Sequence, residues 1–198
     1  MKKTDIIVAL VIGELIALLS FGILKNLGLE VRLLYWILPV FLPVFCLTCL
    51  YIAHILSRKI KVFWQLAKFI LVGVLNTVID LGILNLLMLF SGIVLGSYYS
   101  LFKGISFVAA TINSYFWNKY WTFEKKKTVK PKKEFLQFFV ISAIGFGINI
   151  GTASIIVNLV GPQFNLNLAQ WANMGAITAS FAGLTWNFLG YKFIVFKK

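Results

Sequence analysis

The sequence has few charged side chains and very few acidic ones. Only 13% of its 198 residues are Asp, Glu, Lys or Arg, against about 25% in a typical soluble domain, and Asp and Glu together number six. A soluble enzyme needs ionisable groups gathered in a cleft, and metal-dependent sugar transfer needs carboxylates outside the membrane. So few acids argue against both classes, and we expect that the chain is not an enzyme.

Cysteine and histidine are also scarce. Cys46 and Cys49 are the two cysteines, and His54 is the one histidine. Two cysteines three residues apart on one helix are poorly placed for a disulfide, and a zinc site needs a further ligand and a polar surround. We therefore expect both cysteines to pack at lipid depth, with no metal site. The sequence also lacks the Gly-x-x-x-x-Gly-Lys loop that binds nucleotide phosphates, so it predicts no cofactor.

Apolar side chains, in contrast, make up 60% of the chain and lie in six long runs. Each run has about 20 residues, the length that an α-helix needs to cross about 30 Å of hydrocarbon. The sequence therefore predicts an all-α, polytopic membrane protein with six transmembrane helices. The predicted spans are 6–24, 33–56, 69–90, 101–123, 135–160 and 169–191.

The net charge of +13 comes from basic residues that lie almost wholly between the apolar runs. Lys and Arg accumulate in the cytoplasmic loops of membrane proteins. If the amino terminus is inside, all basic residues except Lys25, Arg32 and Lys103 are cytoplasmic. We interpret the charge as a topology signal, with both termini in the cytoplasm, and not as a surface for nucleic acid. The segment 58–68 is either a short interfacial helix or a plain loop.

The chain repeats itself at an offset of 69 residues, which matches the third and fourth spans to the fifth and sixth. The most telling match is Trp117-Asn118 against Trp186-Asn187. Beyond this pair the best offset grows to 70 or 71. Each repeat begins on the inside, so we expect two parallel two-helix repeats. The expected domains are an extra N-terminal hairpin, 1–61, and a four-helix domain, 62–198, with repeat units 67–123 and 135–198.

Polar residues inside the spans are the candidate site, because a polar group in hydrocarbon is costly unless it is paired or lines a path. Asp80 is the strongest candidate, with Lys68, Lys103 and Lys119 as candidate partners, while Glu14 has no assigned role. The uncharged residues have a plainer interpretation, as seams where small and amide side chains let helices approach closely. The predicted substrate-binding residues are Asn76, Asp80, Lys103, Asn113, Asn118, Lys119, Trp121, Asn149, Trp186, Asn187 and Lys192.

Lysines and aromatic residues occur together at the predicted inner ends of the fourth and sixth spans. Lys119 lies two residues before Trp121, and Lys192 lies among Tyr191 and Phe193. One interpretation is an aromatic belt with lysines that reach for the interface, which is common in membrane proteins. The other is a place for a lipid phosphate, with the rings against an acyl or isoprenoid chain. The sequence leaves both open.

The stretch from about residue 67 to residue 198 resembles the GtrA-like family of small four-helix bacterial membrane proteins. The resemblance is carried by LAKFILVGVLNTVID, SYFWNKYWTF, EFLQFFVISAIGFGIN and TWNFLGYKFIVFKK. The chain departs from the family in its extra hairpin and in a lysine at position 119, where the family often has arginine. The motifs carry over to Asn76, Asn118, Lys119, Trp121 and Phe123 and, by the internal repeat, to Trp186 and Asn187.

The resemblance implies a flippase in a bacterial cell membrane. Its substrate would be a sugar linked to a polyprenyl phosphate such as undecaprenyl phosphate, used for cell-surface polysaccharide synthesis or teichoic acid glycosylation. The alternative hypothesis is a membrane anchor or accessory subunit that recruits a glycosyltransferase through the basic loop 125–133 and transports nothing. Both hypotheses are compatible with a homo-oligomer, and neither involves nucleic acid.

Overall fold

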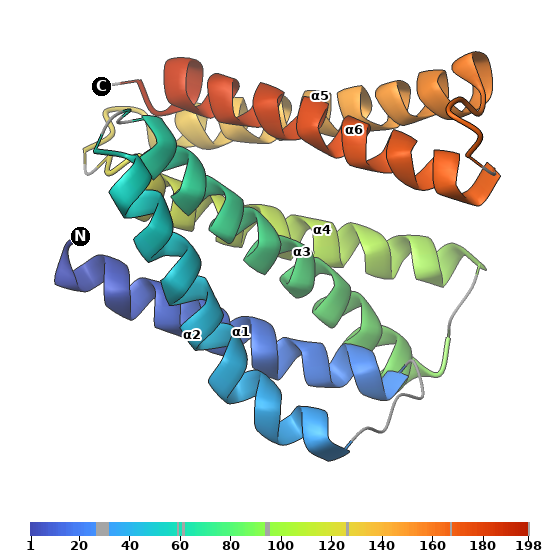
Figure 1. Cartoon of the computed structure of the whole chain (residues 1–198), viewed down its shortest axis with the longest axis horizontal. Coiled ribbons are helices and arrows are strands. Elements are labelled where there is room, and N and C mark those ends of the chain that lie inside the picture. Colours follow the sequence, from blue (N-terminus) through green and yellow to red (C-terminus); the bar gives the residue numbers. More distant parts are fainter. Residues whose placement is uncertain are drawn as a thin grey trace. The chain divides into compact units, whose positions relative to one another are not determined.

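The computed structural model describes residues 1–26, 32–58, 60, 62–93, 96–125, 127–166 and 168–197, and these residues form helices and no strands. The all-α fold class is therefore confirmed. Six α-helices dominate, and three of them lead into a short π-helical segment (Figure 1). The elements are α1 (Lys3–Asn26), α2 (Arg32–Leu56), α3 (Val62–Ser91), α4 (Gly96–Trp117), η1 (Asn118–Thr122), α5 (Pro131–Ser154), η2 (Ile155–Val160), α6 (Leu168–Gly190) and η3 (Tyr191–Val195).

Four of the helical stretches are long and apolar enough to cross a membrane: Lys3–Leu24, Arg32–Leu56, Val62–Ser91 and Pro131–Val160. The other two helices, α4 and α6, are less apolar. Their 22 and 23 residues correspond to about 33 to 35 Å of helix. Each packs along a spanning helix, α4 on α3 and α6 on α5. The chain is therefore a polytopic membrane protein.

The segment between the second and third predicted spans is neither a separate interfacial helix nor a plain loop. Helix α3 begins at Val62 and continues to Ser91, so the residues up to Lys68 form about its first two turns. Lys68 consequently lies on a helix inside the bundle, where it is 1% exposed. Two further basic residues of this segment, Lys59 and Lys61, lie outside the described residues.

Residues Met1–Glu124 form one compact unit, called unit 1 here. Its central helix is α3, which packs against α1, α2 and α4 (Figure 1). Helix α2 crosses α1 at close range because Gly13 has no side chain: a Cβ there would lie 2.4 Å from the Cα of Pro43. The main core of unit 1 contains Ala9, Ile12, Ile16, Cys46, Leu50, Val72, Leu75 and Trp121.

Residues Lys125–Lys198 form a second compact unit, unit 2, whose helices α5 and α6 make an antiparallel hairpin. The two helices meet along a seam of small residues. A Cβ on Gly145 would lie 2.2 Å from the Oδ1 of Asn187, and one on Gly183 would lie 3.1 Å from the carbonyl oxygen of Gly145. The interpretation of these glycines as a helix–helix seam is therefore confirmed.

Both repeated hairpins end in a π-helical turn, η1 after α4 and η3 after α6. The turns begin at Asn118 and Tyr191, 73 residues apart, and each is closed by an equivalent hydrogen bond. The N–H of Phe123 donates to the Asn118 carbonyl, and that of Phe196 donates to the Tyr191 carbonyl. The predicted offset of 70 to 71 for this stretch is therefore wrong. Helix α4 ends at Trp117, whereas α6 continues for four residues, about one turn, beyond the matching Trp186 before its π-helical turn begins.

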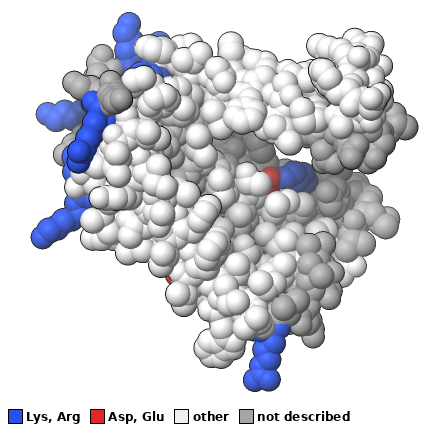
Figure 2. All heavy atoms as spheres, viewed as in Figure 1, with Lys and Arg blue, Asp and Glu red and all other residues white. Residues whose placement is uncertain are grey.

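The surface of the described residues is largely apolar. Figure 2 shows a face on which wide areas carry neither acidic nor basic side chains. Among the exposed side chains are Trp36, Phe90 and Leu159, which are 75%, 84% and 79% exposed. Apolar surface costs roughly 25 cal/mol per Å2 in water, so this surface is suited to lipid as its solvent.

Candidate functional site

An ion pair inside unit 1 joins two of the predicted site residues, Asp80 on α3 and Lys103 on α4. The Nζ of Lys103 contacts Oδ2 of Asp80 directly. The hydroxyl of Ser106, which is fully buried, donates to Oδ1 of Asp80 over 2.6 Å. Both carboxylate oxygens therefore have a donor, and this three-residue arrangement is called the outer charge group below.

The outer charge group lies well within the length of the hairpin. Lys103 is seven residues from the start of α4 and Asp80 is eleven residues from the end of α3, or about 10 and 16 Å from those ends. The side chains of Lys103 and Asp80 are nevertheless 42% and 21% exposed. Exposed charge is costly against hydrocarbon, so this surface is suited to water or a polar ligand.

The structure selects one of the three lysines that the sequence offered as partners of Asp80. Lys103 is that partner, and the other two lie in different surroundings. Lys68 pairs with Asp5, and the Nζ of Lys119 donates to the hydroxyl of Tyr115 over 3.1 Å. The second hairpin has no equivalent of the ion pair: the residues that match Asp80, Lys103 and Ser106 at an offset of 69 are Asn149, Ala172 and Gly175.

A second charged group, called the inner charge group, lies where α1 begins. The Nζ of Lys68 is 2.6 Å from Oδ1 of Asp5, and the two side chains are 1% and 2% exposed. The indole Nε1 of Trp121 donates to the same Oδ1 over 3.0 Å. The ammonium of Lys68 also lies over the rings of Trp64 and Trp121, 4.8 and 5.3 Å from their centroids. These contacts tie α1 to α3 and to η1.

Glu124 extends the inner charge group at the surface. Its Oε2 accepts a hydrogen bond from Lys2 over 2.9 Å, and its Oε1 lies 3.6 Å from the Nζ of Lys68. The hydrogen bond from Lys2 is the main reason why the pKa of Glu124 is lowered, and the same bond raises the pKa of Lys2. Asp5 and Glu124 were not predicted from the sequence as partners. Their signal was present, because both are acids beside basic residues at span ends.

The two predicted headgroup lysines occupy equivalent places, each as the second residue of a π-helical turn. Lys119 is 5% exposed and lies 5.3 and 5.5 Å from the ring centroids of Tyr115 and Tyr120. Lys192 lies 5.5 Å from the centroids of both Phe188 and Phe193. Lys192 is the more accessible of the two lysines.

The predicted tryptophans are part of the packing. Trp121 is 6% exposed and belongs to the core of unit 1, where its indole N–H donates a hydrogen bond to Asp5. Trp186 donates from Nε1 to the carbonyl oxygen of Ile141 over 3.1 Å, which joins α6 to α5. Neither indole N–H is therefore free for a ligand in this conformation.

The predicted amide residues lie in the seams of the two hairpins. The Oδ1 of Asn113 accepts from Trp117, and the amide nitrogen of Asn118 donates to the carbonyl of Ser114. Asn149 of α5 lies against Gly183 of α6: a Cβ added to Gly183 would lie 3.4 Å from the Cβ of Asn149. Some buried amide atoms have no hydrogen-bond partner among the described residues: Asn76 Oδ1, Asn113 Nδ2, Asn118 Oδ1 and Asn187 Oδ1.

The cysteines and the histidine of α2 do not form a ligand set. Cys46 is buried in the core of unit 1 and Cys49 is exposed. The Nε2 of His54 lies 2.8 Å from the amine of Met1, and its ring meets the edge of Trp64. Among the described residues, no three His, Cys, Asp or Glu side chains are close enough together to hold a metal ion.

Comparison with known families covers the two repeated hairpins. Residues 68–196 match the family model described as GtrA/DPMS, transmembrane domain. The chain belongs to this family. It is also similar to the uncharacterized membrane protein YngA of Bacillus subtilis (strain 168), with 31% identity over 141 residues, which are 71% of this chain and 83% of that protein. No solved structure matches the chain. The family resemblance seen in the sequence is confirmed, and α1 and α2 precede the matched region.

Proposed function

We propose that the chain is a translocase, without catalytic activity of its own, that moves a polyprenyl-phosphate-linked sugar between the leaflets of a bacterial cytoplasmic membrane for cell-surface glycan synthesis. Membership of the GtrA/DPMS family supports the link to sugars on a carrier lipid. The observation that carries the proposal is the outer charge group, a partly exposed ion pair within the membrane-spanning part of the first hairpin.

The chemistry of the outer charge group fits a sugar phosphate. The ammonium of Lys103 offers three donors to phosphate oxygens, and the carboxylate of Asp80 accepts from sugar hydroxyls. A phosphate that reaches Lys103 replaces one anion by another, so the lysine is never left without a counter-ion. Asp80 keeps the hydrogen bond from Ser106 and gains hydroxyl donors from the sugar. Lys103 therefore stays paired throughout, while the partly exposed carboxylate of Asp80 exchanges its counter-ion for hydrogen-bond donors.

The two π-helical turns offer a second contact for the phosphate. Each presents a lysine near two aromatic rings at the end of a hairpin, and Lys192 is the accessible one. With both termini in the cytoplasm, as the distribution of Lys and Arg predicts, these turns lie at the cytoplasmic interface and Asp80 lies towards the outer one.

The test is transport by the purified protein in lipid vesicles that contain a fluorescent polyprenyl-phosphate-linked sugar. Loss of one charge-assisted hydrogen bond, about 1.5–3 kcal/mol, should slow movement by at least about tenfold in Asp80→Asn and in Lys103→Met. Thr77→Val on the exposed side of α3 is the matched control and should transport normally. Normal transport by both charge variants would contradict the proposal.

A second candidate function is recruitment of a glycosyltransferase, and one feature of unit 2 favours it. The basic loop and the start of α5 surround a surface hollow of about 400 Å3. Lys125 and Glu134 form an ion pair within it, while Lys127 and Lys130 are exposed. An acidic partner surface could dock there. Transport by the purified protein alone would exclude a purely accessory role, and vesicles without transport that still bind the transferase would support it.

A further inference from the structure

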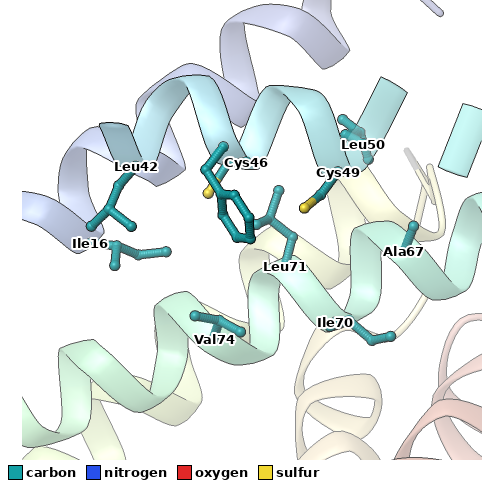
Figure 3. Close-up of a pocket in the computed structure, with 10 residues that line it drawn as sticks. Ile16, Leu42, Cys46, Cys49, Leu50, Ala67, Ile70, Leu71 and Val74 are labelled. Carbon is teal, nitrogen blue, oxygen red and sulfur yellow. The ribbon is translucent and has the colours of Figure 1, made fainter. Parts of the chain in front are cut away.

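An apolar groove of about 320 Å3 lies in unit 1 where α1, α2 and α3 come together (Figure 3). Cys46, Cys49 and Leu50 of α2 and Ala67 and Leu71 of α3 lie on facing sides of this space. Every residue that lines the groove is apolar or a cysteine. It therefore offers no hydrogen bonds and suits a hydrocarbon chain and not a headgroup.

The extra N-terminal hairpin builds most of this groove. Ile16 of α1 and the α2 residues lie before residue 68, where the family match begins, and α3 supplies the other wall. Helix α2 contains Pro39 and Pro43, and it is held to α1 where Pro43 meets Gly13. Prolines inside a helix remove backbone hydrogen bonds and favour a bend, and both prolines lie in the half of α2 that faces α1 at Gly13.

The groove extends along α3 from Ala67 to Val74, about 10 Å, so it admits only the first part of a long lipid chain.

The charges around one end of the groove identify the headgroup that suits it. Leu50 and Ala67 mark the end nearest to the connection between α2 and α3. Arg58 in that connection and Lys3 at the start of α1 are exposed. Basic side chains at the membrane interface attract anionic lipid headgroups. A chain that leaves the groove at this end therefore meets positive charge where a phosphate would lie.

We infer that this groove holds the phosphate-proximal isoprene units of the carrier lipid. The inference rests on the proposed function, which supplies a polyprenyl phosphate as the ligand. It assigns a role to the N-terminal hairpin: α1 and α2 add a binding wall for the carrier chain to a four-helix family domain.

The inference can be tested by photocrosslinking of the full-length protein in phosphatidylcholine vesicles. The probe is a polyprenyl phosphate that carries a diazirine on its second isoprene unit, and adducts are mapped by mass spectrometry. Adducts should concentrate on α2 around Cys49 and on α3 between residues 67 and 74. Undecaprenyl phosphate should compete with the probe, whereas phosphatidic acid, which has the same charge and unbranched chains, should not.

A pair of tryptophan substitutions provides the control for the groove. Val74→Trp fills the groove and should reduce the adduct yield about tenfold, equivalent to about 1.4 kcal/mol. Val44→Trp adds the same side chain to α2 outside the groove, at a position that is 58% exposed, and should not reduce it. Adducts spread evenly over the lipid-facing helices, or equal competition by phosphatidic acid, would overturn the inference.

The outcomes separate this inference from the proposed function. If Asp80→Asn abolishes transport while adducts avoid the groove, the groove assignment fails and the function stands. If the groove is labelled and blocked by Val74→Trp but wild-type vesicles do not transport the sugar, the function fails and the lipid site stands.

Discussion

Breaking the inner charge group on one side should destabilise unit 1 more than breaking it on both sides. Removal of one partner from a buried ion pair leaves an uncompensated charge and costs about 3–5 kcal/mol. In Lys68→Met, the carboxylate of Asp5 keeps hydrogen bonds from Trp121 Nε1 and from the backbone N–H of Lys2, at 3.0 and 2.9 Å. Because these bonds remain, we expect the lower end of the range, about 3 kcal/mol.

The double variant Asp5→Leu/Lys68→Met removes both charges together. Replacement of a buried ion pair by apolar side chains of similar size often leaves the stability of the fold unchanged. Two donors lose their acceptor: the backbone N–H of Lys2, an exposed residue where water can replace it, and the indole N–H of Trp121, for which the loss costs about 1 kcal/mol. The double variant should therefore be about 2 kcal/mol more stable than Lys68→Met, a strongly non-additive result for two residues in contact.

Cys46 is a natural reporter for this measurement. Cys46 is 5% exposed and belongs to the same core as Trp121. In a Cys49→Ser background, a thiol-reactive dye added during heating in detergent reports when that core opens. At about 2–4 °C per kcal/mol, the midpoint should fall by about 6–12 °C in Lys68→Met and by about 2–4 °C in the double variant.

Lys3→Met is the matched control, because Lys3 is an exposed lysine at the start of α1, the helix that carries Asp5. It should leave the midpoint within about 2 °C of the parent. The reasoning is refuted if Lys68→Met behaves like Lys3→Met. It is also refuted if the double variant is no more stable than Lys68→Met, because the two side chains would then not stabilise each other.

Two further variants test the seam of unit 2 and the surface of the inner charge group. Gly145→Ala should destabilise the hairpin of unit 2 by about 1–3 kcal/mol, because the new Cβ meets Asn187. Gly147→Ala is the control and should be neutral, because the space around Gly147 is open. Thermal unfolding followed by circular dichroism compares the two variants. Because the pKa of Glu124 is lowered, its contribution to stability is complete above pH 4.5 and is lost as the pH falls through the lowered value. The unfolding midpoint of the parent should therefore fall more steeply below pH 4.5 than that of Glu124→Gln, and parallel curves would contradict this.

The helices were predictable because the bilayer imposes a length on them. An apolar run of about 20 residues has one stable form in hydrocarbon, a helix that satisfies its own backbone hydrogen bonds. Helix ends were less predictable. α3 begins at Val62, before the first residue of the predicted span, because Lys68 is paired with Asp5 and so can be buried. That pairing depends on α1, which is distant in sequence.

The partner of Asp80 could have been chosen from the sequence by hairpin geometry. Lys68 is twelve residues away on the same helix, which is about 18 Å along its axis. Lys119 lies at the far end of α4, beyond the reach of Asp80. Lys103 is near the connection between α3 and α4, so antiparallel packing brings it to the level of Asp80. The partners in the inner charge group could not be chosen from the sequence in this way, because that choice requires knowing that α1 packs on α3.

The repeat also explains why the two hairpins need different support. In unit 2, Gly145 leaves the space that Asn187 fills. The matching residues in unit 1 are Asn76 and Asn118, two side chains of full size, and the Oδ1 of each has no hydrogen-bond partner among the described residues.

The first hairpin therefore lacks the glycine that makes room for an asparagine in the second. The first hairpin is instead held from outside itself, by Asp5 of α1 on Lys68 and Trp121. The N-terminal hairpin thus stabilises the very hairpin that carries Asp80 and Lys103.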